Sequence, residues 1–394
     1  MKVLYCHNYY QQRGGEDICF EADVEMLRQK GHEVETYVRH NDDIRQDSYV
    51  KIAINTLWSR QSEKEVDALI SSFKPDILHC NNLFPQISPS IYRVANRRQV
   101  PIVQALHNYR AFCANSFFYR DEAVCTECHQ SSTRLAGIRY RCYRDSYAAT
   151  AVVTGMQFLH HSLGTYRNAV DMYFTPSAFT RKIYIEGGFD ADSIDIKPNF
   201  IDPDPGIGKG DGKYILFVGR LSSEKGIETL LEAWNSGSIQ TDLKVVGDGP
   251  LSSLFDLPST NIQWLGRRTL DEVLELVGRA TALVMPSQWY ETFGRTIAES
   301  FSRGTPVIVS DLGAMAELVQ DDVNGFLFRS GDVNDLVEKV NQLINGNPER
   351  LRPAARDSYI RNYTVDAGYD ASIRIYQRAI ERRKLRKTKQ NGLL

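Results

Sequence analysis

Two glutamates, Glu291 and Glu299, stand eight positions apart around a segment typical of a strand-to-helix junction. If the helix begins near Gly294, Glu299 lies ~7–8 Å further along its axis, at a rise of ~1.5 Å per residue. The first amides of a helix have no partner within it and favour an anion such as phosphate. A nucleotide sugar fits this arrangement. One carboxylate can bind the sugar hydroxyls, the helix amides can bind phosphate, and the second carboxylate can bind the ribose. Two glutamates near a helix start also occur simply as partners of the helix dipole.

Two cations follow an earlier apolar run that ends at Val218. Arg220 and Lys225 come after it and before a helical segment, where parallel α/β sheets bind their ligands. An arginine fork and a mobile lysine charge can together hold both phosphates of a leaving nucleoside diphosphate. The alternative is a surface salt bridge of Lys225 with Glu224 or Glu228, which contributes little to stability. Because Arg220 and Lys225 lie at the same edge of the expected sheet, binding of a diphosphate is favoured over a surface salt bridge.

Glycines follow two of the expected strands. Gly14 and Gly15 close the first loop and open the first helix, where missing side chains let amides approach a phosphate. Gly247 and Gly249 follow another strand, but Ser252 stands where a dinucleotide fingerprint needs its third glycine, and the sequence has no P-loop motif. Hydride transfer and P-loop phosphate hydrolysis therefore lose their main support.

The elements that position these residues are clearest in the second half of the chain. An amphipathic segment carries Leu270, Val273, Leu274 and Val277 at helical spacing, and a second helix is expected from Gly294 to Arg303. Short, largely β-branched runs alternate with such segments, at 214–218, 243–246, 261–265, 282–285 and 306–309. Strands joined by helical crossovers predict a doubly wound parallel sheet.

The first half repeats the pattern less regularly. A strand is expected at 3–7, a helix at 15–30, and further strands at 33–38, 76–79 and 102–106. Residues 198–212 are rich in proline and glycine, which marks a linker between domains. At 394 residues the chain has room for two cores. We therefore expect an N-terminal Rossmann-like acceptor-side domain at 1–203, a C-terminal nucleotide-sugar domain at 204–365, and at 366–394 a helix that can cross back to the first domain and ends in a basic tail.

Composition excludes several classes of protein. The formal net charge is −2, so no global positive field favours nucleic acid, and 42% hydrophobic with 24% charged residues indicates an ordinary globular chain. The first residues read as a strand and not as a signal peptide, and no apolar run is long enough to span a bilayer. We expect a cytoplasmic protein, with peripheral contact at the inner face of the membrane left open.

The motifs in order resemble the family-four retaining glycosyltransferases of the GT-B fold, also described as glycosyl transferases group 1. The resemblance covers nearly the whole chain. It is carried by Gly219-Arg220…Glu224-Lys225-Gly226, Gly247-Asp248-Gly249-Pro250, Pro286-Ser287…Tyr290-Glu291…Phe293-Gly294…Glu299, Gly304-Thr305-Pro306-Val307, and in the first half Gly14-Gly15, Leu106-His107-Asn108 and Lys197-Pro198-Asn199. It implies two Rossmann-like domains facing each other across a cleft, with no metal required.

The resemblance also implies roles for single residues. Glu291 would accept hydrogen bonds from the donor sugar, and Glu299 would hold the ribose. Arg220 and Lys225 would stabilise the departing diphosphate, and His107 would face the donor sugar from the other domain. Thr292 departs from the proline or glycine that many relatives have after the first glutamate. The remaining donor-binding set is Gly14, Gly15, Gly247, Arg267 near the base, Thr292, and the amides of Phe293, Gly294 and Thr296.

Four of the seven cysteines lie close together in sequence: Cys113, Cys125, Cys128 and Cys142. Their pattern can form a structural zinc site, although the outer spacings are irregular and buried thiols are common. The same segment carries many aromatic and arginine side chains, which suit a carbohydrate acceptor on a diphosphate-lipid anchor. The apolar stretch 148–163 is either a core helix or a surface that rests on a bilayer. The basic stretch 378–389 is either a solvated helix end or attracted to anionic lipid.

The leading hypothesis is a retaining, metal-independent hexosyltransferase in exopolysaccharide or glycolipid biosynthesis. Its donor is a nucleotide diphosphate sugar, with UDP-glucose or a related UDP-hexose expected from what is common in the family. Its acceptor is a saccharide or lipid-linked oligosaccharide. The alternatives are a nucleotide-sugar epimerase or hydrolase on the same fold, and a zinc or nucleic-acid-binding protein that uses the cysteines and the basic tail.

Overall fold

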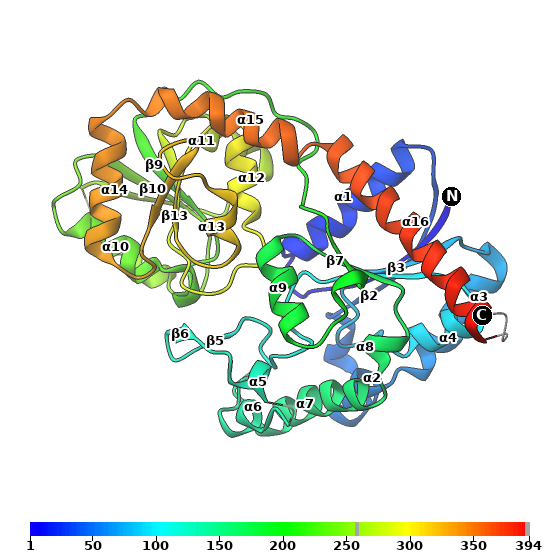
Figure 1. Ribbon diagram of the computed structural model, residues 1–394. Coiled ribbons are helices and arrows are strands. Elements are labelled where there is room, and N and C mark those ends of the chain that lie inside the picture. Colours follow the sequence, from blue (N-terminus) through cyan, green and yellow to red (C-terminus); the bar gives the residue numbers. More distant parts are fainter. Residues whose placement is uncertain (132, 257–259, 391–394) are drawn as a thin grey trace. The chain divides into compact units, whose positions relative to one another are not determined.

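The computed structural model describes residues 1–131, 133–256 and 260–390, and the chain divides into two compact units (Figure 1). The first unit comprises Met1–Phe118, Cys125–Lys197 and the chain from Tyr369 onward, and the second comprises Tyr119–Val124 and Pro198–Gly368. Each unit contains a six-stranded sheet in which every neighbouring pair of strands is parallel. The predicted α/β class with two doubly wound sheets is confirmed.

The sheet of the first unit has the order β2-β1-β3-β4-β7-β8. Its strand order reverses between β1 and β3, so the loops after these strands flank a crevice at their carboxyl ends. The elements of this unit are β1 (Lys2–Tyr9), α1 (Gly15–Gln29), β2 (Glu33–His40), α2 (Tyr49–Leu57), α3 (Arg60–Phe73), β3 (Ile77–Cys80), α4 (Ile91–Arg97), β4 (Ile102–Ala105), α5 (Glu127–Gln130), α6 (Leu135–Arg139), α7 (Tyr147–Ser162), α8 (Thr165–Asn168), β7 (Met172–Thr175), α9 (Ala178–Glu186) and β8 (Ile194–Ile196).

The sheet of the second unit has the order β11-β10-β9-β12-β13-β14. The order reverses between β9 and β12. The elements are the short hairpin β5 (Tyr119–Arg120) and β6 (Ala123–Val124), then β9 (Tyr214–Val218), α10 (Ile227–Asn235), β10 (Asp242–Val246), β11 (Ile262–Gly266), α11 (Leu270–Arg279), β12 (Ala282–Met285), α12 (Arg295–Ser302), β13 (Val307–Ser310), α13 (Ala314–Leu318), β14 (Gly325–Phe328), α14 (Val333–Asn345) and α15 (Arg352–Asn362).

The central strand β9 is buried on both faces. Tyr214 and Leu216 enter one apolar cluster with residues of α11, α12 and α15, whereas Ile215 and Phe217 enter another with residues of α10 and α14. Alternate residues of a strand point to opposite faces, so a strand between two helical layers must be apolar at every position. This is why the continuous run 214–218 predicts a buried strand.

Element boundaries agree with the expected ones within a few residues. Short β7, β8 and β14 were not expected. In α11 the predicted apolar stripe is buried at Val273, Leu274 and Val277, but Leu270 is exposed because it occupies the first helical position.

The proline- and glycine-rich segment 198–212 forms neither helix nor strand, but it packs on the second unit. Arg356 forms an ion pair with Asp204, and Arg303 donates to the carbonyl oxygen of Gly206 at 3.0 Å. Arg352 donates to the carbonyl oxygen of Gly208 at 2.8 Å. Three arginines therefore fix backbone that has no regular hydrogen bonding of its own.

Helix α16 (Val365–Gln390) begins in the second unit and continues in the first. Its arginines pair within the first unit: Arg378 with Asp195, Arg382 with Asp190, and Arg383 and Arg386 with Asp171. These cations of the predicted basic tail are therefore paired with protein carboxylates and are not a solvated cluster. Residues 391–394 of the expected tail lie outside the described residues.

Candidate functional site

In the second unit, two loops meet where the strand order reverses. Residues 219–226 follow β9 and residues 286–294 follow β12, and these strands are neighbours in the sheet. In doubly wound sheets, ligands bind at this switch point, beyond the carboxyl ends of the strands. Arg220, Lys225, Glu291 and Gly294, predicted separately from sequence, all lie on these two loops.

Lys225 and Glu291 join the two loops directly. The Lys225 Nζ lies 2.5 Å from Glu291 Oε1, and the fully buried Ser287 donates its hydroxyl to the same oxygen at 3.0 Å. The Lys225 ammonium also lies 5.3 Å from the ring centroid of Trp289. The glutamate side chain is 9% exposed and the lysine side chain 21%. The pair is therefore largely removed from water. A phosphate bound here would contact the Lys225 ammonium, and a hydroxyl could donate to the Glu291 carboxylate.

Arg220 lies on the same loop but has a different partner. Its guanidinium forms an ion pair with Glu224 and donates from Nε to Ser222 Oγ at 3.2 Å. Burial alone would raise the pKa of Glu224, but the hydrogen bonds from Arg220 and Ser222 lower it below its usual value. The arginine side chain remains 47% exposed, so its guanidinium is held by Glu224 and Ser222 and is still accessible to solvent.

Glu299 lies in the first turns of α12, beyond Gly294, which precedes the helix with φ +90°. Arg295 Nε donates to Glu299 Oε1 at 2.9 Å, and both side chains are largely buried. Burial raises the pKa of Glu299, and Arg295 opposes that shift. Of the other residues predicted here, Phe293 is buried and edge-on to Tyr363, and Thr296 donates its hydroxyl to Met285 Sδ at 3.4 Å. Thr292 lies on the loop just before them, partly buried.

At Gly247 the backbones of the loops after β9 and β10 are in close contact. It has φ +138°, and a Cβ added to it would lie 1.8 Å from the carbonyl oxygen of Gly219. Gly219 N in turn donates to the Val246 carbonyl at 3.0 Å. Arg267 lies beside this loop, with its Nε 3.3 Å from Asp248 Oδ2 and most of its side chain exposed.

We expect Gly247→Ala to lower the free energy of unfolding by roughly 2–3 kcal/mol, because both the backbone conformation and the close carbonyl exclude a side chain. Urea unfolding followed by tryptophan fluorescence measures the change. Gly237→Ala is the matched control, since Gly237 also has positive φ but open space around its Cβ position. A loss at Gly247 no larger than that at Gly237 would contradict the close-contact explanation.

In the first unit, Gly14 and Gly15 begin α1. Gly14 N donates to Asp17 Oδ2 at 2.8 Å, and Asp17 Oδ1 lies 2.8 Å from His7 Nε2, with both of these side chains fully buried. A Cβ on Gly15 would have no neighbour within 4 Å, so open space borders the start of the helix. Gly14 has φ −119°, an ordinary extended conformation, and its backbone does not itself require glycine.

His107 follows β4 in the first unit. Burial and the nearby Lys197 cation lower its pKa to about 3. Lys197 is itself buried and lies 2.7 Å from Asp23 Oδ1. The His107 ring packs edge-on against Phe174 at a centroid distance of 5.9 Å. His107 is therefore a neutral imidazole at neutral pH, suited to hydrogen bonding and not to ion pairing.

We expect no titration of His107 between pH 5 and 8, in contrast to a free histidine of pKa about 6.5. Because the native state binds this proton more weakly than the unfolded chain, His107 leaves stability unchanged above pH 6.5 and lowers it as pH falls toward 3. Histidine ring proton resonances, assigned with His107→Gln, measure the titration. A midpoint near 6.5 for the resonance lost in that variant would contradict the prediction.

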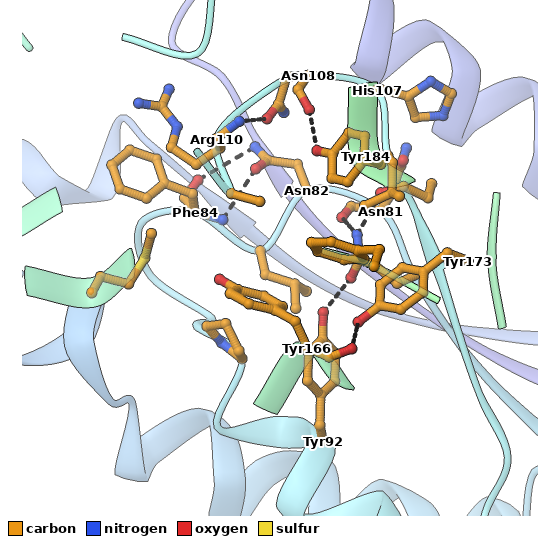
Figure 2. A pocket seen from close by; sticks show the side chains of 18 residues that line it. Asn81, Asn82, Phe84, Tyr92, His107, Asn108, Arg110, Tyr166, Tyr173 and Tyr184 are labelled. Atoms are coloured by element: carbon orange, nitrogen blue, oxygen red, sulfur yellow. Dashed lines mark hydrogen bonds between the residues drawn. The ribbon is translucent and has the colours of Figure 1, made fainter. Parts of the chain in front are cut away.

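A cavity of about 80 Å³ lies in the first unit, beyond the ends of β3 and β4 (Figure 2). Its walls combine tyrosine rings with side-chain amides. Tyr92 donates to Gln104 Oε1 at 2.5 Å, Gln104 Nε2 donates to the Asn81 carbonyl at 2.7 Å, and Tyr184 donates to the Asn108 carbonyl at 2.5 Å. Further residues of the lining are Asn82, Phe84, His107, Arg110, Met156, Tyr166 and Tyr173. Of these, the sequence analysis identified only His107 as a site residue.

Comparison with known proteins places both units in one family. A model described as glycosyl transferases group 1 matches residues 202–358, and one described as glycosyltransferase family 4 matches residues 24–205. Together the two models cover residues 24–358, and the chain is a glycosyltransferase of the group 1/family 4 type. It is 25% identical over 370 residues to the uncharacterized glycosyltransferase MJ1178 of Methanocaldococcus jannaschii, covering 89% of this chain and 90% of that protein. It is also 26% identical to the sulfoquinovosyl transferase SQD2 of Arabidopsis thaliana, over 73% of this chain and 54% of that protein.

Solved structures give the fold of this glycosyltransferase. HepE of Anabaena, determined in complex with UDP, has a TM-score of 0.65 at 17% identity and covers 96% of this chain and all of that one. Sucrose-phosphate synthase of Thermosynechococcus elongatus has a TM-score of 0.70 at 17% identity, over 96% and 98% of the two chains. The expected GT-B fold is confirmed.

The predicted zinc site of this glycosyltransferase is not supported. Among residues 1–131, 133–256 and 260–390, no group of three or more potential ligands is arranged to hold a metal ion. Cys113 Sγ donates to Asn115 Oδ1 at 2.9 Å, and Cys128 Sγ faces the Arg134 carbonyl at 3.9 Å. Burial raises the pKa of both thiols, that of Cys128 to about 11. None of Cys113, Cys125, Cys128 and Cys142 forms a disulfide among the described residues, and the raised pKa of Cys113 and Cys128 favours the thiol over the thiolate that zinc needs.

Proposed function

We propose that this glycosyltransferase moves a hexose from a UDP-sugar, with UDP-glucose as the first choice, to a hydroxyl of a saccharide or lipid-linked oligosaccharide. The second unit would take the donor and the first unit the acceptor. The ion pair of Lys225 and Glu291 at the switch point carries this proposal, because it offers opposite charges side by side where a doubly wound sheet binds its ligand. Complexes of HepE with UDP and with UDP-glucose support the choice of donor.

The assigned roles follow from the charge of each group. Lys225 and Arg220 bind the diphosphate, and Glu291 accepts hydrogen bonds from hydroxyls of the sugar. Glu299 accepts hydrogen bonds from the ribose while Arg295 fixes its carboxylate. In the first unit, the neutral His107 hydrogen-bonds to the donor sugar and the Gly15 amide to phosphate. Thr292 and the amides of Phe293, Gly294 and Thr296 complete the donor site, and Gly247 and Arg267 lie toward the base.

Catalysis follows from where charge develops. As the bond from the anomeric carbon to the phosphate oxygen breaks, negative charge rises on the diphosphate. Cations already in place bind this state more tightly than the ground state. A new bond forms from the anomeric carbon to the acceptor oxygen on the same face, and the acceptor proton passes to the leaving phosphate oxygen. This gives retention, and the side-chain cations do the work that a divalent metal does elsewhere.

Nucleotide binding gives the first test. UDP and UDP-glucose should raise the melting temperature of the purified protein, whereas GDP, ADP and dTDP should not, because only a ligand of the native state stabilises it. EDTA should leave the shift unchanged. Stabilisation by GDP and not UDP would overturn the donor assignment, and loss of the UDP shift with EDTA would overturn metal independence. No shift with any nucleotide would overturn the proposed function.

Stereochemistry gives the second test and needs no acceptor. Slow hydrolysis of UDP-α-glucose, followed by proton NMR, should release α-glucose before mutarotation mixes the anomers. Release of β-glucose first would contradict retention. Rapid conversion of the donor to an isomeric nucleotide sugar would identify an epimerase instead.

A further inference from the structure

Two neighbouring helices of the first unit each expose apolar side chains. Figure 1 shows α2 beside α7, and His160 of α7 lies with its Nε2 3.0 Å from the Leu57 carbonyl oxygen at the end of α2. Tyr49, the first residue of α2, is 93% exposed, and Phe158 of α7 is 58% exposed. Further exposed apolar residues on the two helices and just after α7 are Val50, Ile54, Tyr147 and Leu163. We call these six residues the α2–α7 surface.

The outer side of α7 is exposed, so packing within the first unit does not explain its apolar residues. Tyr147, Ala151, Phe158 and Ser162 recur at helical spacing along one exposed side, while Val153 and Met156 lie in a buried cluster on another. From Tyr147 to Leu163 there is no Asp, Glu, Lys or Arg. An ordinary surface helix carries charged residues on its solvent side, so the composition of this face indicates contact with something apolar.

The charge around this surface selects the kind of partner. On the α7 side, residues 134–167 contain five arginines, of which Arg134 is buried, and one aspartate, Asp145, which lies 3.3 Å from Arg141. Arg139, Arg141 and Arg144 are exposed just before α7, and the Arg141 guanidinium lies 5.6 Å from the ring centroid of Tyr147. Aromatic and aliphatic side chains bordered by arginines match the boundary of an anionic bilayer, where rings enter the headgroup region and cations meet phosphate.

We propose that the α2–α7 surface docks the enzyme on an anionic lipid bilayer. A symmetric dimer through the same surface would bring two arginine clusters together, since an isologous interface pairs each patch with its own copy. Among the residues that the structure describes, no helix is long and apolar enough to cross a membrane.

The docking rests on the proposed function, because it specifies the acceptor. Met156 lies on the inner side of α7 and lines the cavity of the first unit, while Phe158 faces outward on the same helix. One helix therefore contacts the cavity on one side and the bilayer on the other. This arrangement suits a saccharide that remains attached to a lipid while its sugar end occupies the cavity.

Flotation with vesicles tests the docking on the full chain. The protein should float with phosphatidylcholine vesicles that contain phosphatidylglycerol and remain free with pure phosphatidylcholine. Tyr147→Ser with Phe158→Ser should reduce the bound fraction, and Arg141→Glu with Arg144→Glu should weaken binding about tenfold or more, because each cation near an anionic surface contributes ~1 kcal/mol. The matched control is Ile360→Ser with Arg361→Glu, an exposed apolar and basic pair on α15 of the second unit.

Several outcomes would overturn the docking: no binding, equal binding to both kinds of vesicle, or an equal loss in the control. A dimer in light scattering that Phe158→Ser dissociates would assign the surface to a second copy instead. The docking variants should keep the wild-type melting temperature and the wild-type UDP shift. A loss of vesicle binding with an intact UDP shift concerns docking alone, whereas absence of any nucleotide shift in the wild type concerns the proposed function.

Discussion

Lys225→Ala should lower kcat/KM for sugar transfer about 10²–10³-fold while the protein stays folded. The lysine offers a largely desolvated positive charge beside Glu291, and removing such a group from a water-poor site costs transition-state stabilisation of this size. Radiolabel transfer from UDP-glucose to a membrane-lipid extract measures the rate, and circular dichroism checks the fold. The loss should be larger in kcat than in donor KM, because the charge on the diphosphate grows as the bond breaks.

Two variants sharpen this prediction. Lys209→Ala removes an exposed lysine of the same unit and should leave the rate unchanged. Lys225→Arg keeps the charge but replaces a compact ammonium by a planar group, so it should recover part of the activity. If Lys225→Ala transfers sugar at the wild-type rate with its fold intact, the lysine has no role in charge stabilisation.

Several strands that the sequence predicted, β9 among them, are continuous apolar runs, and the reason is burial on both faces. The run at 214–218 predicts β9 with the observed bounds because each of its residues enters one of two cores. By contrast, β7 and β14 are four residues long and read Met-Tyr-Phe-Thr and Gly-Phe-Leu-Phe. Runs this short and with so few β-branched residues do not distinguish a strand from a piece of buried loop or helix.

The residues of the proposed donor site were predicted one at a time, but their partners were not. Lys225 and Glu291 are 66 positions apart, and their pairing depends on β9 and β12 being neighbours in the sheet. Sequence spacing suggested Glu224 or Glu228 as the salt-bridge partner of Lys225, whereas Glu224 pairs with Arg220. The four-residue spacing of Arg295 and Glu299 on a helix was a signal that could have identified that pair beforehand.

The cavity of the first unit and the arrangement of the four cysteines could not be predicted from sequence spacing. Tyr92, Gln104 and Tyr184 come from three separate elements, α4, β4 and α9, and only the folded sheet brings them together. The cysteines have spacings that a zinc site can use, but spacing does not fix the direction of a thiol. Cys113 and Cys128 instead face polar groups of their own segment.

The largest expected effect on stability comes from α16. Asp171 is fully buried before β7 and accepts a hydrogen bond from Ile102 N at 2.8 Å and another from Arg383 Nη2 at 2.6 Å. Arg383→Met keeps an unbranched apolar stem and high helix propensity but removes the cation that lies closest to this carboxylate. We expect the free energy of unfolding to fall by roughly 3 kcal/mol, the lower end of the cost of breaking a buried ion pair, because Arg386 Nη1 still lies 3.2 Å from Asp171 Oδ1.

Urea unfolding compares Arg383→Met with two other variants. Lys384→Met removes an exposed cation at the next position and should change stability by less than about 0.5 kcal/mol. Asp171→Asn together with Arg383→Met should be less destabilising than Arg383→Met alone, because the neutral amide can still accept from Ile102 N and no buried carboxylate remains without Arg383. If the double variant is as unstable as the single one, the loss comes from the packing of the Arg383 side chain and not from its charge.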